Sequence, residues 1–145
     1  MKSRIVFLLV FMLCLGSFGG ASALAEVNRP GKGEFEIQYV GTKQVKAQIT
    51  DNSGSAKCTG ILYLKSSNYK ATITTKLQKK VGNGWLTVSG ATWSKSGTGT
   101  GKIQAGGSKA METGNTYRTY TSARVTDLDG NYIETVTDTS SSISY

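Results

Sequence analysis

Apolar and polar residues alternate through most of the chain. In residues 45–50, Val45, Ala47 and Ile49 alternate with polar side chains. Residues 69–81 repeat the pattern, with apolar residues on one side and threonines and lysines on the other. A repeat of two residues is typical of a strand with one buried face. No stretch of a dozen residues shows a period of 3.6, so the pattern predicts an all-β protein.

Two further runs extend this prediction. Residues 34–40 (EFEIQYV) place Phe35, Ile37 and Tyr39 on one side of a strand, and residues 57–64 (KCTGILYL) form a mixed apolar strand. Short strands at this spacing, with no helix between them, are typical of an antiparallel all-β sandwich or a partly open barrel. We predict a single-domain β-sandwich of about seven to eight strands over residues 34–145.

Turn-forming residues separate the predicted strands. Residues 51–54 (DNSG) and 96–101 (SGTGTG) predict loops, the second of them flexible. The Asn-Gly pair at 83–84 suits a two-residue type I′ turn, because that turn needs positive φ angles at both positions. This turn would pair Val81 with Leu86 on the core side.

The stretch VTDLDGNYIETV, residues 125–136, gathers acidic and turn residues and suggests two structures. The spacing does not fit a calcium loop, because Gly130 would be at position 4, whereas such a loop needs its glycine at position 6. As a hairpin it fits a three-residue loop at 128–130, with Gly130 left-handed in a bulge and Asp127 accepting backbone N–H bonds.

The register of that hairpin follows from the pattern of its side chains. A three-residue loop would pair Val125 with Ile133 on the inner face and Arg124 with Glu134 as an ion pair outside. A two-residue loop would instead pair Val125 with Glu134. The pattern therefore favours the three-residue loop with a turn as its role rather than a metal site.

The N-terminal residues have the features of an export signal. Lys2 and Arg4 precede an apolar run over residues 5–15, and Ala23 and Ala25 form an A-x-A cleavage site. The run is short for a permanent membrane helix, which is the alternative interpretation. We predict a signal peptide at residues 1–25, a loose arm at 26–33 and a secreted, extracellular protein, free or associated with the cell wall.

Export limits what the cysteines can do. Cleavage after residue 25 removes Cys14 and leaves Cys58 alone, so no intramolecular disulfide can form. A single thiol in an exported protein is either buried as a small apolar side chain or available for an intermolecular bond. The strand-like surroundings of Cys58 favour burial.

The chain is strongly basic. It has 17 Lys and Arg residues against 9 Asp and Glu, a formal net charge of +8. Loss of Lys2 and Arg4 with the signal peptide would leave about +6. For an exported protein the polyanions at hand are cell-wall polymers, lipid headgroups and stray nucleic acid. The alternative is that the charge serves only solubility.

Catalytic groups are scarce. The chain contains no histidine, which excludes Ser-His-Asp and Cys-His mechanisms and the usual histidine-bearing zinc sites. The acidic residues are scattered and suggest no glycosidase pair. We therefore predict a protein without enzymatic activity, with no catalytic residues, no cofactor and no metal.

A surface for binding is the remaining candidate. In a strand, Arg118, Tyr120 and Arg124 point to one side and form an Arg/Tyr stripe suited to polar contacts. Trp85 and Lys80 could add to such a surface. The alternatives are an ordinary solvated sheet face and, for Trp85 and Trp93, packing in the core rather than stacking on carbohydrate.

Residues 77–94 (LQKKVGNGWLTVSGATWS) and 117–140 (YRTYTSARVTDLDGNYIETVTDTS) carry a resemblance. The chain resembles a family of small exported β-proteins of Firmicutes, Gram-positive bacteria, whose function is not established. The shared positions are Leu77, Gly84, Trp85, Trp93, Tyr117, Arg118, Gly130, Glu134 and Thr135. The resemblance covers roughly the C-terminal half and implies an exported sandwich, with no active site to transfer.

These observations predict a secreted, non-catalytic binding module. The expected partner is an anionic cell-wall polymer or another surface component, with no specific nucleic acid and no transmembrane segment after signal cleavage. The alternative is a secreted antagonist, either a bacteriocin-like toxin or an enzyme inhibitor.

Overall fold

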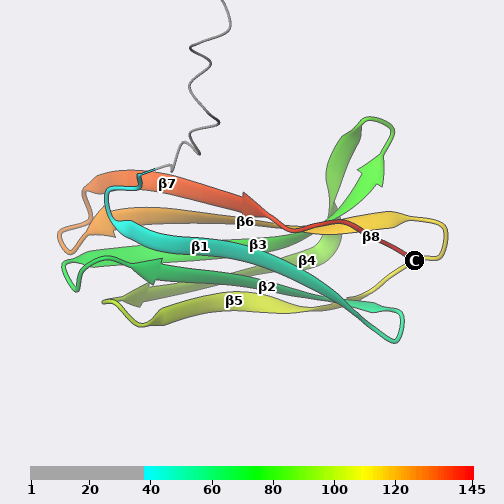
Figure 1. The fold of residues 1–145 in the computed structure, drawn as a ribbon, viewed down its shortest axis with the longest axis horizontal. Helices are drawn as coiled ribbons and strands as arrows, with labels where there is room; N and C mark the ends of the chain where they lie inside the picture. The colour runs from blue at the N-terminus through cyan, green and yellow to red at the C-terminus, as the bar shows by residue number, and fades with distance from the viewer. Residues whose placement is uncertain (1–37) are drawn as a thin grey trace, which may run out of the picture. The chain divides into compact units, whose positions relative to one another are not determined.

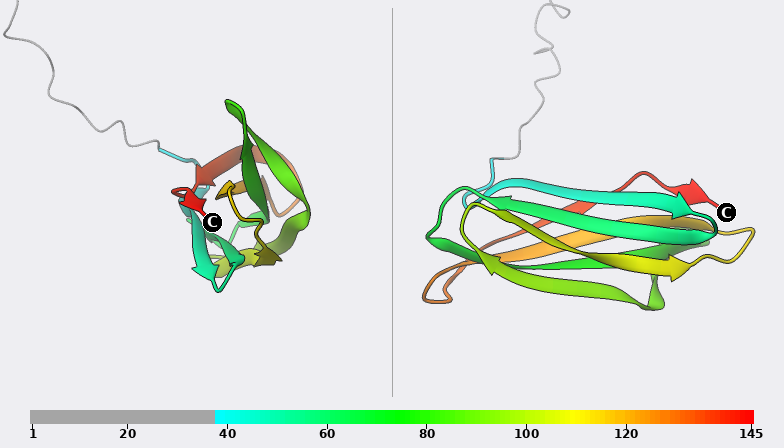
Figure 2. Two further views of the ribbon diagram at one scale, coloured as in Figure 1. Left: turned by 90° about the vertical axis from the view of Figure 1, so that its right-hand side faces the viewer. Right: turned by 90° about the horizontal axis from the view of Figure 1, so that it is seen from below.

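The computed structural model describes residues 38–145, which form an all-β, antiparallel structure of two facing sheets (Figures 1 and 2). One sheet has the order β1-β2-β5, and the other has the order β4-β3-β6-β7 with β8 added beside β6. The strands are β1 (Thr42–Asn52), β2 (Ser55–Leu64), β3 (Tyr69–Val81), β4 (Gly84–Thr98), β5 (Lys102–Ala110), β6 (Thr116–Asp127), β7 (Tyr132–Thr139) and β8 (Ile143–Ser144). This confirms the predicted fold class and strand number.

Several predictions fall outside the described residues. These are the signal peptide at 1–25, the arm at 26–33 and residues 34–37 of the first predicted strand. No helix long and apolar enough to cross a membrane occurs among residues 38–145.

The alternation of the sequence determines which side chains are buried. β3 has the bounds predicted for it, and its inner residues Ala71, Ile73, Thr75 and Leu77 are all buried. β2 extends two residues further than predicted at its N-terminal end, and every second residue from Ala56 to Leu64 is buried. Period-two patterning therefore accounts for the inner faces of both sheets.

The core consists of two apolar clusters separated by threonines. The larger cluster is built on Leu62, Ile73 and Val125, and the smaller one on Cys58 and Leu77 with their neighbours. Between them, Thr75 and Thr121 of the larger sheet are fully buried opposite Gly60 of β2. The Thr75 hydroxyl donates to the Ala105 carbonyl at 3.1 Å, which satisfies it inside the core.

The predicted strand over residues 34–40 is wrong for its described part. Residues 38–40 are not in a strand, and β1 begins at Thr42. The cause is Glu134 of β7, whose carboxylate accepts the backbone N–H groups of Val40, Gly41 and Thr42 at 2.7, 2.9 and 2.8 Å. These N–H groups therefore point at a side chain instead of a neighbouring strand.

A second carboxylate of β7 also bonds to β1. Asp138 accepts the backbone N–H of Ala47 at 2.7 Å. β1 and β7 each lie at the edge of their own sheet, and a sheet edge leaves backbone groups unpaired. Glu134 and Asp138 thus close this seam between the sheets.

The predicted register at the β3–β4 turn is wrong by one residue. Val81 pairs with Gly84, so the turn is centred on residues 82–83 and not on 83–84. Gly82 has φ of +56°, which fits the first central position of a type II′ turn, the other common hairpin turn. Val81 and Leu86 are not on the core side either, because they are 49% and 61% exposed.

The flexible loop predicted over residues 96–101 is shorter than expected. β4 continues to Thr98, and only Gly99, Thr100 and Gly101 connect it to β5. Ser96 remains in the strand because it faces Thr72 of β3, with their hydroxyl oxygens 2.7 Å apart.

The turn at 127–131 is confirmed. Gly130 has φ of +93° and donates its N–H to the Asp127 carbonyl at 3.2 Å. The Asp127 carboxylate accepts the Asn131 backbone N–H at 2.8 Å and its side-chain amide at 2.7 Å. The side-chain hydrogen bond from Asn131 is the main reason that the pKa of Asp127 is lowered.

The register beyond this turn is not the predicted one. A bulge at Ile133 follows the Thr126–Tyr132 pair, so that Val125 faces Glu134 and Arg124 faces Thr135. The expected Arg124–Glu134 ion pair is therefore wrong. The bulge turns Glu134 to the inner side of β7, where it reaches the first residues of β1.

Candidate binding face

The outer side of the larger sheet carries a row of cations. On β3 these are Lys70, Lys76 and Lys80, and on β6 they are Arg118 and Arg124. Four of them alternate with buried residues of their own strands, and Lys80 continues the alternation of β3 beyond its last buried residue, Leu77, so all five are assigned to the outer side. We call these five residues, with Trp85, Tyr120 and Tyr132, the basic face.

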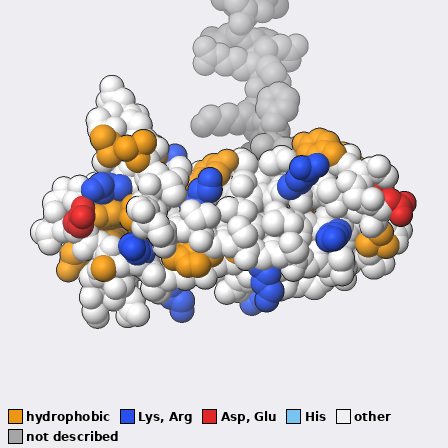
Figure 3. Space-filling view, turned by 180° about the vertical axis from the view of Figure 1, so that it is seen from behind, with side chains coloured by type: hydrophobic (Ala, Val, Ile, Leu, Met, Phe, Trp, Pro, Cys, Tyr) orange, Lys and Arg blue, Asp and Glu red, His pale blue; other side chains and the backbone are white. Residues whose placement is uncertain are grey.

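Among residues 38–145, no carboxylate lies on the basic face. The described residues include six acidic side chains: Asp51, Glu112, Asp127, Asp129, Glu134 and Asp138. Asp51 and Asp127 lie at strand ends, Glu112 and Asp129 lie in connections, and the two carboxylates of β7 bond to β1. Figure 3 shows one side of the molecule, with Lys and Arg spread along its length and carboxylates only near its two ends.

Three of the predicted binding residues meet where the β3–β4 hairpin begins. The Arg118 guanidinium lies 4.2 Å from the centre of the Trp85 ring, and its Nε donates to Gln78 Oε1 at 2.9 Å. Lys80 is the strand partner of Trp85. A guanidinium stacked on an indole and held by an amide keeps its remaining N–H groups free in a fixed orientation.

The other two predicted residues lie further along β6. Tyr120 is the strand partner of Lys76, two residues from Arg118. Arg124 is six residues from Arg118, about 20 Å along a strand. It lies 5.6 Å from the centre of the Tyr132 ring. The structure therefore brings Arg118, Trp85 and Lys80 together and places Arg124 in a separate cation–aromatic pair.

Hydroxyl groups occupy the rows between the cations. Thr72 and Ser96 lie with their hydroxyl oxygens 2.7 Å apart, and those of Thr74 and Ser94 are 2.8 Å apart. These cross-strand bonds join β3 to β4 on the outer side. The basic face is thus a hydroxyl-rich sheet surface with cations at intervals.

Three residues of this face were not among the sequence candidates: Lys70, Lys76 and Tyr132. The β3 residues could have been found, because they share the outer side of the predicted strand with Lys80. Tyr132 could not, because its place beside Arg124 depends on the pairing of β6 with β7.

The outer side of the smaller sheet is also basic but carries fewer charges. Lys46, Lys57 and Lys102 are exposed there, one on each strand. Neither of the two described arginines lies on this side. It provides a matched comparison for the basic face, since the same number of charges can be removed from either.

Two features of the described residues bear on metal binding and on the single thiol. Residues 38–145 contain no group of three or more His, Cys, Asp or Glu side chains placed to hold a metal ion. Cys58 is 1% exposed, which confirms its predicted burial. Burial raises the pKa of its thiol, although the nearby Thr119 side chain acts in the opposite direction.

Because Cys58 is buried, we expect its thiol to react slowly with labelling reagents. With the folded protein, an aromatic disulfide reagent should label Cys58 more than about a hundredfold more slowly than a free thiol, because only the thiolate reacts and it must first be exposed. The absorbance of the released thiolate, followed with and without urea, measures this. Rapid labelling without urea would contradict the packing around Cys58.

The tryptophans have different surroundings. Trp93 packs against the smaller core cluster, as the core interpretation predicts, and its indole fills the space that a Cβ at Gly107 would need. Trp85 lies on the outer side beneath Arg118. The core interpretation is therefore confirmed for Trp93 only.

No protein-family model and no curated protein sequence matches the chain. The resemblance to exported β-proteins of Firmicutes stays a prediction.

Proposed function

We propose that this protein is a secreted, non-catalytic binding module whose basic face binds an anionic polymer of the cell surface or cell wall. The observation that carries the proposal is the separation of charge. Five cations occupy the outer side of the larger sheet, and all six described carboxylates lie elsewhere. A polyanion on this face meets no fixed negative charge from the described residues.

The spacing of the cations favours a polymer over a small anion. Lys70 and Lys80 are ten residues apart on β3, which is about 33 Å along a strand. No small anion reaches both. An extended polymer lying along β3 and β6 would pass all five cations, with serine and threonine hydroxyls between them.

The aromatic residues support binding of a polymer with polar and apolar faces. Arg118 stacked on Trp85, and Arg124 beside Tyr132, present flat surfaces next to fixed charges. Such pairs hold their guanidinium groups in place before the ligand arrives, which lowers the entropy cost of binding.

The test is retention on isolated Gram-positive cell walls over a salt series. Replacing Lys70, Lys76 and Arg124 by glutamine should weaken retention about a hundredfold at low salt. The reason is that each cation beside an anionic surface contributes roughly 1 kcal/mol of binding free energy. The matched control replaces Lys46, Lys57 and Lys102 by glutamine and removes the same charge from the other sheet. The control should retain most of the binding.

Two results would oppose the proposal. Equal loss in both triple variants would mean that net charge alone causes retention. No retention of the unmodified protein at low salt would remove the polymer altogether. Walls stripped of their anionic polymers serve as the second support, and retention there should fall to the level of the basic-face variant.

A further inference from the structure

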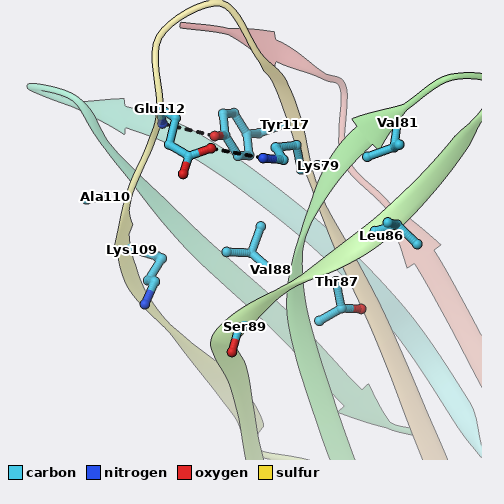
Figure 4. Close-up of a pocket in the computed structure, with 10 residues that line it drawn as sticks. All are labelled: Lys79, Val81, Leu86, Thr87, Val88, Ser89, Lys109, Ala110, Glu112 and Tyr117. Carbon is cyan, nitrogen blue, oxygen red and sulfur yellow. Dashed lines mark hydrogen bonds and ion pairs between the residues drawn. The ribbon is translucent and has the colours of Figure 1, made fainter.

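A groove opens where the β3–β4 hairpin leaves the sandwich (Figure 4). Pairing of β3 with β4 is interrupted between Lys76–Thr92 and Gln78–Thr87, because β4 has four residues there against one on β3. Beyond this bulge, residues 78–87 form an arm that bends away from the two sheets (Figure 1). The groove, of about 360 Å³, lies between the arm and the end of β5.

The groove has an apolar wall and basic residues beside it. Val81 and Leu86 of the arm are 49% and 61% exposed, and both line the groove with Val88. Lys79 and Lys109 line it as well, and so does Glu112, which pairs with Lys79 Nζ at 2.9 Å. The arm thus has two different sides, since Lys80 and Trp85 belong to the basic face.

Two free strand edges border the groove. β4 is the last strand of its sheet, and β5 is the last strand of the other. Within residues 38–145 neither edge has a partner there. A free edge beside an apolar wall is a template for one more extended segment, which binds by main-chain hydrogen bonds and by alternate side chains.

The chain contains a segment suited to that place. Residues 34–37 (EFEI) alternate acidic and apolar side chains, and the alternation predicts a strand. Residues 38–40, which continue the pattern, pair with no strand of their own sandwich. Phe35 and Ile37 match the apolar wall, and Glu34 and Glu36, on the other side of such a strand, match Lys80.

The same copy cannot supply this segment to its own groove. Gly41 lies beside Tyr69 at the start of β3, whereas Lys79 of the groove is ten residues further along that strand, about 33 Å away. Residue 34 precedes the first described residue by four positions, a reach of roughly 14 Å in a fully extended chain. The segment can therefore fill the groove of a neighbouring copy only.

We propose that residues 34–37 of one copy bind as an added strand in the groove of the next copy. Phe35 and Ile37 pack on Val81 and Leu86, and the glutamates lie on the opposite side of the added strand, the side of the arm that carries Lys80. Donor and acceptor lie in different parts of the molecule, so the contact is head-to-tail and propagates into linear assemblies. This proposal does not depend on polymer binding and is tested without any polymer.

The experiment is sedimentation velocity of the chain from residue 26 onward at rising protein concentration. The unmodified protein should form a ladder of species above the monomer. Leu86→Asp in the groove and the double change Phe35→Asp, Ile37→Asp in the segment should each leave a monomer. Leu128→Asp is the control, because Leu128 is 59% exposed in the β6–β7 turn, and it should assemble normally.

Mixing the two deficient proteins separates this arrangement from a dimer in which the grooves of two copies pack on each other. The segment variant keeps its groove and the groove variant keeps its segment, so an equal mixture should give a 1:1 heterodimer and nothing larger. Circular dichroism of each variant checks that it is folded, and Val81→Asp replaces Leu86→Asp if that variant is not. A monomeric unmodified protein, assembly by the segment variant, or no pairing in the mixture would each overturn the proposal.

Discussion

Replacing Gly60 by alanine should destabilise the protein by about 3 kcal/mol, from overpacking of a closely packed core together with loss of a buried hydrogen bond. A Cβ at this position would overlap the Thr75 hydroxyl oxygen and would lie 2.7 Å from the Thr121 hydroxyl oxygen. Both threonines are fully buried. They have little room to move because they separate the two apolar clusters of the core.

The loss of stability in Gly60→Ala has two physical causes, which can be measured separately. Displacing Thr75 breaks its bond to the Ala105 carbonyl, and the added methyl group also crowds Thr121. In Thr75→Ala the clashing oxygen is absent, so adding Gly60→Ala to that background should cost at least about 1 kcal/mol less than in the unmodified protein. Urea unfolding of the four proteins measures this coupling.

Gly101→Ala is the matched control for Gly60→Ala. Nothing lies within 4 Å of a Cβ at Gly101, and its φ is not positive. The urea midpoint of the Gly101→Ala protein should change little or rise slightly, since alanine restricts the unfolded chain. A Gly60→Ala protein as stable as the Gly101→Ala protein would contradict the close approach of the two sheets at β2.

Strand positions could be predicted from the sequence because they depend on local patterning. The bounds of β3 and the burial of Ala71, Ile73 and Leu77 follow from alternation within that strand. The turn at 127–131 follows from Asp127 and Gly130, whose roles are confined to five residues. In such places the local residues alone select the structure.

Contacts between strands could not be predicted in the same way. The bulge at Ile133 moves Glu134 away from Arg124, and the advantage of this move lies in backbone N–H groups more than ninety residues away. Gly60 likewise reads as an ordinary strand residue until Thr75 and Thr121 are placed opposite it. Both depend on how the two sheets pack.

For the basic face, too, some features could be predicted from one strand and others depend on contacts between strands. Arg118, Tyr120 and Arg124 could be assigned to one side from β6 alone, whereas the stacking of Arg118 on Trp85 needs β3 to lie between their strands. Exposure of Val81 and Leu86 was missed because the bulge that turns the arm outward is formed by residues 88–91 of β4. The pattern of apolar and polar residues does not indicate that bend.

Replacing Glu134 by alanine should destabilise the protein by about 2–3 kcal/mol. Its carboxylate accepts three backbone N–H groups at the start of β1, and hydrogen bonds to a charged acceptor contribute about 1.5–3 kcal/mol each when buried. The expected loss is smaller than their sum, because the Val40 N–H is exposed and water can replace its partner. Glu134→Gln keeps one acceptor oxygen and should lose less.

The dependence on pH gives this prediction a second measurement. Partial burial acts to raise the pKa of Glu134, but the N–H donors outweigh it and hold the pKa below its ordinary value. A carboxylate with a lowered pKa in the folded state adds stability above its unfolded pKa of about 4.3, and that stability is lost as the pH falls through the lower folded value. The difference between the unmodified protein and Glu134→Ala should therefore be constant near neutral pH and shrink below about pH 4.

Glu112→Gln is the control for Glu134→Ala. Glu112 also pairs through its carboxylate, with Lys79 Nζ at 2.9 Å, but its side chain is 73% exposed. Exposed pairs contribute little to stability, so urea unfolding of this variant should match that of the unmodified protein. Two results would contradict the prediction: a Glu134→Ala protein as stable as the unmodified protein, or a loss of stability that does not shrink in acid. Either would mean that pairing with β2 alone holds β1, and that the carboxylates of β7 do not close the sandwich.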